Sequence, residues 1–407
     1  MEAYFQRSVD EVNRFAKFSE DDFRLFEEVD KAAEELTVVE YESYLEREFD
    51  SKAVDILKKH SLVGISVKKE NGGRGASPIV ATLASERLAQ AGLGATSAIG
   101  ASIGLAGSCI ENWGSPEQKQ RYLVPAAKGD KMLAYALTEP EAGSDPVSLQ
   151  MTFEEKDGDY LLNGTKYMIT NGSIADAVIT FAYPKGEREG MTAFIVDTDR
   201  DGYEVAMKLK EKIGLFTSDT AMIEFHDVKV PVENRLGIPG KGLWVAYVAL
   251  ISGRMAVASG CLGVMENCLS AVKERATNRW QHGKPIGKHQ LIQQHIAEMA
   301  MNLEMARWPT YNAAFKIEDW EKTPLDKGLR VDVDQASSIA KRVASRRAYD
   351  TADRAVQVFG GFGYSTLSPV TKHYLDTRVT RIFEGTDEIM DLKIASGVLG
   401  RDFEAYS

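Results

Sequence analysis

The sequence predicts an α+β fold that is mostly helical, with a helical N-terminal domain, a middle β domain and a C-terminal antiparallel helical bundle. Two changes of residue pattern along the 407-residue chain support this division. Near residue 150 the helical spacing of apolar residues gives way to short alternating runs, and after about residue 233 the helical spacing returns. We therefore expect domains at residues 1–134, 135–235 and 236–407.

The first domain carries two helix-start signals. Ser19 and Asp22 have the spacing of a capping box at the start of FSEDDFRLFEEVDKAAEEL. In GSPEQKQRYL, Ser115 can cap a helix, Pro116 suits the first helical position, and Gln118 can return a hydrogen bond to the cap. We expect a helix after each signal, the second beginning at about residue 116.

Short alternating runs between residues 150 and 233 predict the β domain. They include YLLNGTKYMIT, AVITFAY, TAFIVDT and AMIEFHDVKV, whose residues alternate as half-buried strands require. Asn163 and Gly164 form a dipeptide that is typical of tight hairpin turns. We therefore expect a tight turn at Asn163-Gly164.

Helical spacing then extends over three long runs, at about residues 242–278, 289–316 and 331–359. Helices of this length with a broad apolar stripe favour an antiparallel bundle. Pro309 lies inside the second run and should kink it. Cys261 and Cys268 lie seven residues apart on the first run and are interpreted as small core residues.

Composition excludes several classes of function. The formal net charge of -11 repels phosphate backbones and anionic membrane surfaces, so neither nucleic acid nor a membrane is an expected partner. The opening MEAYFQRSVDEVNRF carries charges where a secretion signal needs an apolar run, and no later segment holds about 18 unbroken apolar residues. We expect a cytoplasmic protein.

The three cysteines and the glycines offer no known cofactor motif. The cysteines lack C-x-x-C spacing and a matching histidine cluster, so neither a disulfide scaffold nor a metal site is expected. A Rossmann site is not supported either, because QVFGGFGY follows a predicted helix and not a strand.

Two segments carry candidate chemistry. In RIFEGTDEIM, Glu384 stands between Phe383 and Gly385, where burial would raise the pKa of a carboxylate; the alternative is a plain loop into the helix after Thr386. In YALTEPEAGSD, hydroxyls and glycine N–H groups could meet a phosphate or the edge of a heteroaromatic ring. The alternative for this second segment is a surface turn.

Five blocks, YALTEPEAGSD, MITNGS, FHDVKVPVENRLG, QVFGGFGY and IFEGTDEI, resemble those of the acyl-CoA dehydrogenase family in order and rough spacing. The resemblance covers nearly the whole chain. It implies a homotetrameric flavoprotein with a helical N-terminal domain, a middle β-barrel-like domain and a C-terminal four-helix bundle. It also implies FAD-dependent oxidation of an acyl-CoA to the 2,3-enoyl thioester.

By this resemblance Glu384 is the general base that removes the α-proton. Its backbone N–H would meet the enolate oxygen, together with a ribityl hydroxyl of the flavin, and Gly385 would leave room for the substrate chain. Some family members carry the base one residue before an arginine on the first bundle helix. Here that arginine is Arg254, near the thioester end of the site by resemblance, and Gly253 precedes it. Arg254 could equally be a buried helix cation with a structural partner.

The resemblance also implies flavin contacts by position. Leu137 and Thr138 match residues at the pyrimidine edge of the ring system, and Ser144 lies near the pyrophosphate and the bound thioester. Met168 matches the position next to the flavin ring, and Thr170 matches a hydroxyl near N5.

A second set matches positions that contact the cofactor between subunits or at its nucleotide. Arg279, Gln281 and Gln290 resemble residues that reach the FAD of a neighbouring subunit. The other matches are adenosine contacts across the dimer, at Gln357 and Gly361, and nucleotide contacts within the first subunit, at Thr386 and Glu388.

Several positions depart from the family pattern. Met168 replaces a tryptophan on the route to the usual acceptor, electron-transfer flavoprotein, which bears on whether that protein is the partner. Phe216, Leu375 and Ser396 replace arginines, so contacts with the CoA phosphates or between subunits should differ.

Two alternatives to the dehydrogenase remain open. An enoyl-CoA reductase or an acyl-CoA oxidase would share the fold, and Met168 leaves space for either. A non-catalytic nucleic-acid-binding relative belongs to a different class, and the acidic balance of the chain disfavours it.

Overall fold

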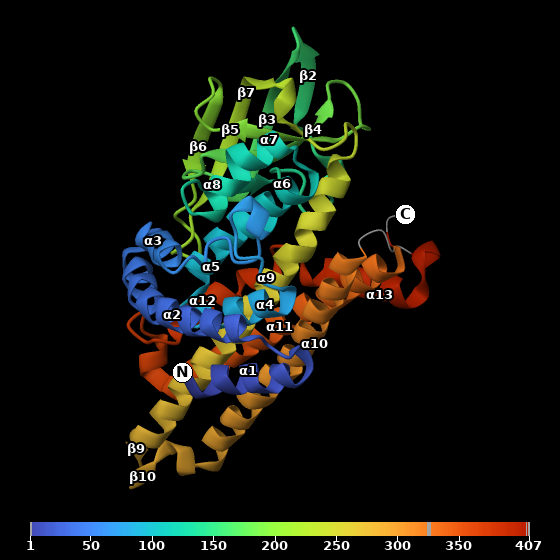
Figure 1. The fold of residues 1–407 in the computed structure, drawn as a ribbon. Helices are drawn as coiled ribbons and strands as arrows, with labels where there is room; N and C mark the ends of the chain where they lie inside the picture. The colour runs from blue at the N-terminus through green and yellow to red at the C-terminus, as the bar shows by residue number, and fades with distance from the viewer. Residues whose placement is uncertain (1, 324–326, 404, 406–407) are drawn as a thin grey trace.

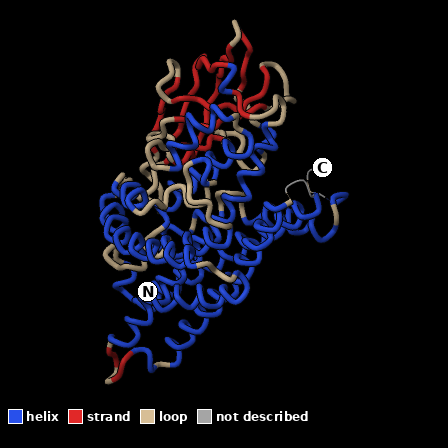
Figure 2. Tube along the Cα trace, in the orientation of Figure 1, coloured by secondary structure: helices blue, strands red, loops and turns tan. Residues whose placement is uncertain are grey.

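The computed structural model describes residues 2–323, 327–403 and 405 and confirms the predicted fold class. Figure 1 shows the strands of the β domain gathered at one end, the long helices of the bundle running to the other, and the N-terminal helices between them. Figure 2 shows the same arrangement, with one short hairpin of strands at the far end of the bundle.

The N-terminal helices form as the capping signals predict. Ser19 and Asp22 form a complete capping box at the start of α2, and Ser115 and Gln118 form another at the start of α7. Both predicted starts are confirmed, because these side chains satisfy N–H groups that a helix end leaves unpaired. The helices of this region are α1 (Glu2–Ala16), α2 (Glu20–Glu46), α3 (Lys52–Lys59), α4 (Pro78–Leu88), α5 (Leu93–Ile99), α6 (Ser108–Trp113), α7 (Pro116–Gln118) and α8 (Val124–Ala127).

The β domain is one eight-stranded sheet with its own apolar core. The strands are hydrogen-bonded in the order β6-β7-β3-β2-β4-β5-β8, and β1 adds to β4 in parallel. Phe194, Phe225 and Ile223 lie in the core cluster of the sheet. The strands are β1 (Leu133–Ala136), β2 (Thr152–Lys156), β3 (Asp159–Thr170), β4 (Ala177–Pro184), β5 (Thr192–Asp197), β6 (Tyr203–Lys208), β7 (Thr220–Pro231) and β8 (Arg235–Leu236).

The predicted tight turn at Asn163-Gly164 is wrong. β3 runs through both residues, and Gly164 is required there because a Cβ would lie 2.8 Å from Cα of Met151. The turn between β2 and β3 falls instead at Asp157-Gly158, where φ is 53° and 82°. Two successive positive φ values are the mark of a type I′ hairpin turn, for which an Asp-Gly pair is suited.

The C-terminal region is the predicted bundle. α9 (Gly242–Asn278), α10 (Gln290–Lys322), α11 (Lys327–Phe359) and α13 (Asp387–Leu399) pack together, and α12 (Thr371–Thr377) lies against α11. α9 and α10 are joined by the hairpin β9 (Trp280–Gln281) and β10 (Lys284–Pro285). α10 continues through Pro309, and Cys261 and Cys268 are buried as expected.

Two helical stretches, Leu93–Trp113 and Gly242–Asn278, are long and apolar enough to cross a membrane. In this fold 67% and 78% of their most apolar windows are buried inside the protein. Their apolar surface is therefore used largely for packing against other elements of the chain.

A buried polar cluster connects the N-terminal helices to the bundle. Arg307 of α10, with 1% side-chain exposure, pairs with Glu266 of α9 and approaches Glu86 of α4 at 3.5 Å. Tyr311 donates a 2.5 Å hydrogen bond to the second carboxylate oxygen of Glu86. These pairs fix the position of α4 on α9 and α10.

Replacing Arg307 with Met should lower the free energy of unfolding by about 3–5 kcal/mol, because two buried carboxylates would lose their cation. Urea denaturation followed by circular dichroism measures this. Arg7→Met is the matched control, since Arg7 pairs with Glu304 at 3.6 Å on the surface and its loss should cost less than about 1 kcal/mol. Equal costs for the two variants would show that the buried cluster is not a structural connection.

Candidate active site

Glu384 lies in a tight turn just before α13. The N–H groups of Ile382 and Phe383 both donate to the carbonyl of Val379, at 2.8 and 3.1 Å, which closes the chain on itself. Glu384 then adopts φ of 54° and Gly385 φ of 94°, and Thr386 caps α13 by accepting from the N–H of Ile389. A left-handed glutamate is strained and persists only where its surroundings hold it.

The carboxylate of Glu384 rests on the backbone of α9. A Cβ on Gly253 would overlap Oε2 of Glu384, so a side chain at position 253 and this carboxylate position exclude each other. Although the residue as a whole is only partly buried, Oε2 is inaccessible to solvent and has no hydrogen-bond partner in the described structure. Burial raises the pKa of Glu384 to about 7, while the charges of Arg254 and Lys341 lower it.

Arg254 has a structural partner. It is 2% exposed, and its Nη1 pairs with Oδ1 of Asp334 on α11 at 2.5 Å. Asp334 also pairs with Lys393 of α13 at 3.1 Å, so three bundle helices meet at this pair. The interpretation of Arg254 as a buried, paired cation is therefore supported, and its charge also reaches Glu384.

Lys341 is a site residue that the sequence analysis missed. It is fully buried on α11, and its Nζ donates to the carbonyl of Gly385 at 2.5 Å. The available signal was a polar stripe at helical spacing, formed by Asp334, Ser338, Lys341 and Ser345, on a helix whose core positions are mostly alanine.

The loop after β1 is fixed from below by a buried lysine. Lys166 of β3 donates to the carbonyl of Leu137 at 3.1 Å and to Glu139 at 2.7 Å. Glu139 accepts in turn from the N–H of Met151 at 3.1 Å, and Tyr167 donates its N–H to the carbonyl of Thr138 at 2.9 Å. The loop therefore has a fixed shape before any ligand binds.

The upper side of this loop is open, and its groups fit a flavin nucleotide. No atom lies within 4 Å of where a Cβ on Gly143 would stand, and Ser144 is exposed. Met168 is 51% exposed and has φ of 59°, and Thr170 pairs with Thr220 at the end of β3. Hydroxyls and free glycine backbone suit a phosphate, and an exposed Met can pack on an aromatic ring.

The second predicted set lies elsewhere in the chain. Arg279 and Gln281 belong to the hairpin tip between α9 and α10, at the end of the molecule opposite the β domain (Figure 1). Gln290 begins α10, Gln357 lies in the last turn of α11, and Gly361 lies in the 3₁₀ turn that follows. This end of α11 is near α9, since Arg275 donates to the carbonyl of Phe359 at 3.3 Å. One chain does not bring this set to the loop at Thr138, whereas Thr386 and Glu388 begin α13, beside Glu384.

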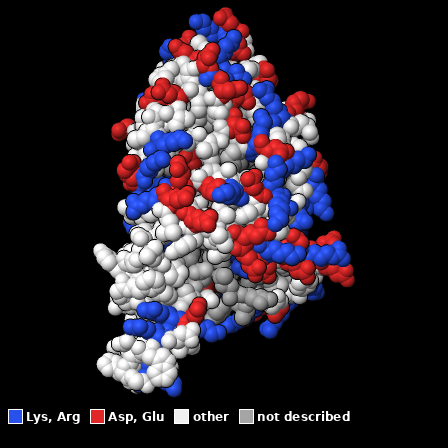
Figure 3. Space-filling model, turned by 90° about the vertical axis from the view of Figure 1, so that its left-hand side faces the viewer, with Lys and Arg blue, Asp and Glu red and all other residues white. Residues whose placement is uncertain are grey.

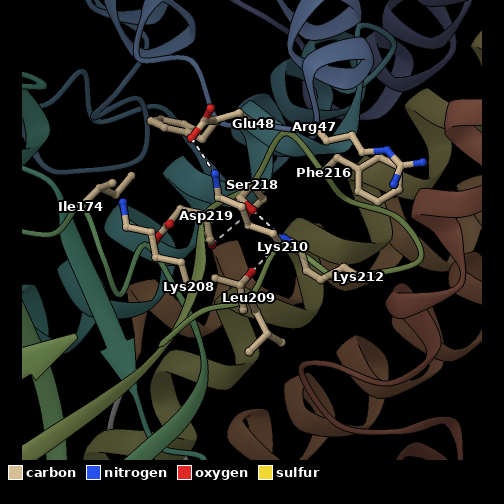
Figure 4. A pocket seen from close by; sticks show the side chains of 12 residues that line it. Arg47, Glu48, Ile174, Lys208, Leu209, Lys210, Lys212, Phe216, Ser218 and Asp219 are labelled. Carbon is tan, nitrogen blue, oxygen red and sulfur yellow. Dashed lines mark hydrogen bonds and ion pairs between the residues drawn. The ribbon is translucent and has the colours of Figure 1, made fainter. Parts of the chain in front are cut away.

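Two of the departures from the family pattern occupy neighbouring segments. Phe216 is buried, stacks on Tyr44 at 6.0 Å between ring centroids, and lies 4.7 Å from the guanidinium of Arg47. Leu375 lies close to Gly214, two residues before Phe216, since a Cβ on Gly214 would overlap the backbone carbonyl of Leu375. The surface pocket beside Phe216 has three lysines, of which Lys210 pairs with Glu48 at 3.2 Å (Figure 4).

Comparisons with known proteins agree with this architecture. Models of the acyl-CoA dehydrogenase N-terminal, middle and C-terminal domains match residues 19–130, 134–228 and 240–399. A short-chain-specific acyl-CoA dehydrogenase of Megasphaera elsdenii is 38% identical over 360 residues, which are 87% of this chain and 91% of the relative. A 3-(aryl)acrylate reductase of Clostridium sporogenes is 34% identical over 91% of this chain and 96% of its own length.

Solved structures give the same result. Butyryl-CoA dehydrogenase from Megasphaera elsdenii superposes with a TM-score of 0.87 at 35% identity, over 94% of this chain and 99% of its own. An acyl-CoA dehydrogenase from Bacillus anthracis, solved in complex with FAD, has a TM-score of 0.88 at 30% identity, over 96% of this chain and 70% of its own. The chain belongs to the acyl-CoA dehydrogenase family of FAD-dependent oxidoreductases.

Proposed function

We propose that the protein oxidises an acyl-CoA thioester to the 2,3-enoyl-CoA, with Glu384 as the base that removes the α-proton. The observation that carries this proposal is the carboxylate of Glu384, whose Oε2 is buried and unpaired against Gly253. A proton α to a thioester is weakly acidic, so its removal needs a base with a pKa near neutrality. Burial raises the pKa of Glu384 into that range.

The side chain and the backbone of Glu384 have separate roles in this reaction. The carboxylate of Glu384 takes the α-proton, and the double bond forms as the β-hydrogen leaves with its electron pair. Bound FAD supplies the acceptor for that hydride. In the described part of the chain the backbone N–H of Glu384 donates no hydrogen bond, so it can donate to the thioester oxygen as negative charge develops there.

The cofactor would be held by the loop after β1 and by a second subunit. Leu137, Thr138 and Ser144 would hold the flavin and its phosphates, with Met168 and Thr170 beside the ring. The positions far from this loop would contact FAD bound mainly by a neighbouring chain of a homotetramer; they are Arg279, Gln281, Gln290, Gln357 and Gly361. Two observations support this arrangement. The hairpin between α9 and α10 is far from the loop after β1 in one chain (Figure 1). The lower part of the face in Figure 3, over the bundle, carries few charges, as a surface between subunits would.

A second candidate function differs in the direction of the reaction or in the electron acceptor. The similarity to a 3-(aryl)acrylate reductase favours testing reduction of the double bond as well as its formation. Met168 is exposed, and by the family pattern it would lie beside the flavin ring on the route to an electron acceptor, either electron-transfer flavoprotein or O₂. Mixing the reduced protein with each acceptor separates a dehydrogenase from an oxidase.

Glu384→Gln should slow flavin reduction by acyl-CoA about 10²- to 10⁴-fold, because an amide cannot accept the α-proton. Anaerobic stopped-flow absorbance with a panel of acyl-CoAs, beginning with short chains, measures the rate. The FAD content of the purified variant should equal that of the unmodified protein. A variant that keeps both its FAD and its full rate would exclude Glu384 as the base.

The value of kcat/KM should fall as the pH drops through about 7, since the base works only as the carboxylate and burial holds the pKa of Glu384 near that value. At lower pH the decrease should approach tenfold per pH unit. Initial rates between pH 5.5 and 9, in buffers of constant ionic strength, give the profile. A limb centred near 4.5, the ordinary value for glutamate, would contradict a buried base.

Gly253→Ala should lower the rate of flavin reduction about tenfold or more, because the new methyl group would displace the carboxylate of Glu384. The methyl group would also press on Cδ2 of the buried Leu105, so the free energy of unfolding should fall by about 1–3 kcal/mol. Gly260→Ala, on the same helix but facing Leu93, is the matched control and should keep its rate. Equal rates for all three proteins would place the working carboxylate elsewhere.

A further inference from the structure

Lys341 is a buried cation that the proposed reaction does not use directly. It lies on α11 with no exposed surface, one helical turn before Ser345, which approaches Asp387 of α13 at 3.4 Å. Its Nζ donates to the carbonyl of Gly385, the residue directly after the proposed base. A lysine is rarely buried without an anionic partner, and here the oxygen that it meets belongs to a backbone carbonyl.

That hydrogen bond acts on a strained turn. Glu384 and Gly385 both have positive φ, and a non-glycine residue in this conformation costs on the order of 1–3 kcal/mol. The amine of Lys341 holds the peptide group between Gly385 and Thr386 at 2.5 Å, while the N-cap of α13 holds the chain one residue further on. Lys341 of α11 therefore holds the turn at the carbonyl of Gly385.

The anion with the largest effect on Lys341 is Asp387 of α13. Asp387 also pairs with Arg381 at 2.7 Å and is approached by Arg342 at 3.8 Å. The other titratable groups that influence Lys341 are Glu384 itself and, from α9, Cys261 and Arg254. Burial lowers the pKa of Lys341 to about 8, so the amine is still mostly protonated at neutral pH.

On the β-domain side, Tyr135 completes the surroundings of Glu384. Burial raises the pKa of Tyr135, and its hydroxyl donates to the carbonyl of Ala246 at 3.4 Å, so it is neutral at all working pH values. Arg254 is paired with Asp334. Lys341 is thus the cation near Glu384 for which the described residues provide no carboxylate salt-bridge partner.

We propose that Lys341 is a positioning residue, which holds the Glu384–Gly385 turn in its reactive conformation and favours the charged form of the Glu384 carboxylate. This inference rests on the proposed role of Glu384 as the base. The amine of Lys341 acts on the carboxylate in two ways, by holding the carbonyl of Gly385 in the same turn and through its positive charge.

Lys341→Met tests this, because it keeps the aliphatic volume and removes the amine. The variant should retain FAD, and its KM for acyl-CoA should stay within a few-fold of that of the unmodified protein. Its flavin should be reduced roughly 10- to 100-fold more slowly. Removing a positive charge favours protonation of Glu384, so the ascending limb of the pH profile should move to higher pH. Lys341→Arg keeps the charge and should leave that limb in place.

Ser345→Ala is the matched control, since it removes a buried polar group one turn along the same helix without touching the turn at Glu384. It should keep both the rate and the pH profile. If Lys341→Met does not fold, Lys341→Gln, which is neutral but keeps an N–H donor, should show the same upward move of the limb. A folded neutral variant with an unchanged limb and rate, or a Ser345→Ala variant with the same defects, would overturn the positioning role.

Glu384→Gln measured in parallel separates the two proposals. If that variant keeps its full rate, the proposed base is wrong and Lys341 has no base to position. If that variant is inactive while Lys341→Met matches the unmodified protein in rate and pH profile, the role of Lys341 alone is excluded.

Discussion

The structure of the site depends on one contact, between the carboxylate of Glu384 and the bare backbone of α9 at Gly253. The contact removes Oε2 from water without giving it a hydrogen bond, which is costly for a charged group and raises its pKa. Two buried cations, Arg254 and Lys341, offset part of that cost from α9 and α11. A carboxylate in this balance can gain and lose a proton near neutral pH.

The long helices make this contact possible. α9, α11 and α13 converge where Arg254, Asp334 and Lys393 form a chain of ion pairs, and the turn at Glu384 enters beside them. The N-terminal helices are held on the same bundle by the buried cluster around Arg307. The β domain contributes a loop whose underside is fixed by Lys166, leaving its upper side for a ligand. Rigid elements thus position each group on which the chemistry depends.

Much of this could be predicted from the sequence, because the relevant signals are local. The capping boxes at Ser19 and Ser115 and the long helical runs depend on neighbouring residues alone, and the predicted run 242–278 has the bounds of α9. The predicted turn at Asn163-Gly164 was wrong because glycine is needed at position 164 for another reason. Met151, on a different segment, approaches the backbone there too closely for a side chain. Resemblance to a family singled out Glu384. Lys341 was missed because its partner is a backbone carbonyl 44 residues away, so the polar spacing along α11 does not reveal which group it meets.

The most direct measurement of the central interaction is a pH titration of the Glu384 carboxyl group itself. Infrared difference spectra between the unmodified protein and Glu384→Gln, both loaded with FAD, isolate the carbonyl stretch of the protonated acid. A buried and unpaired carboxyl group predicts a band that disappears with a midpoint near pH 7. A midpoint near 4.5, or a band at the frequency of a solvated acid, would show that the carboxylate faces water and does not rest against α9.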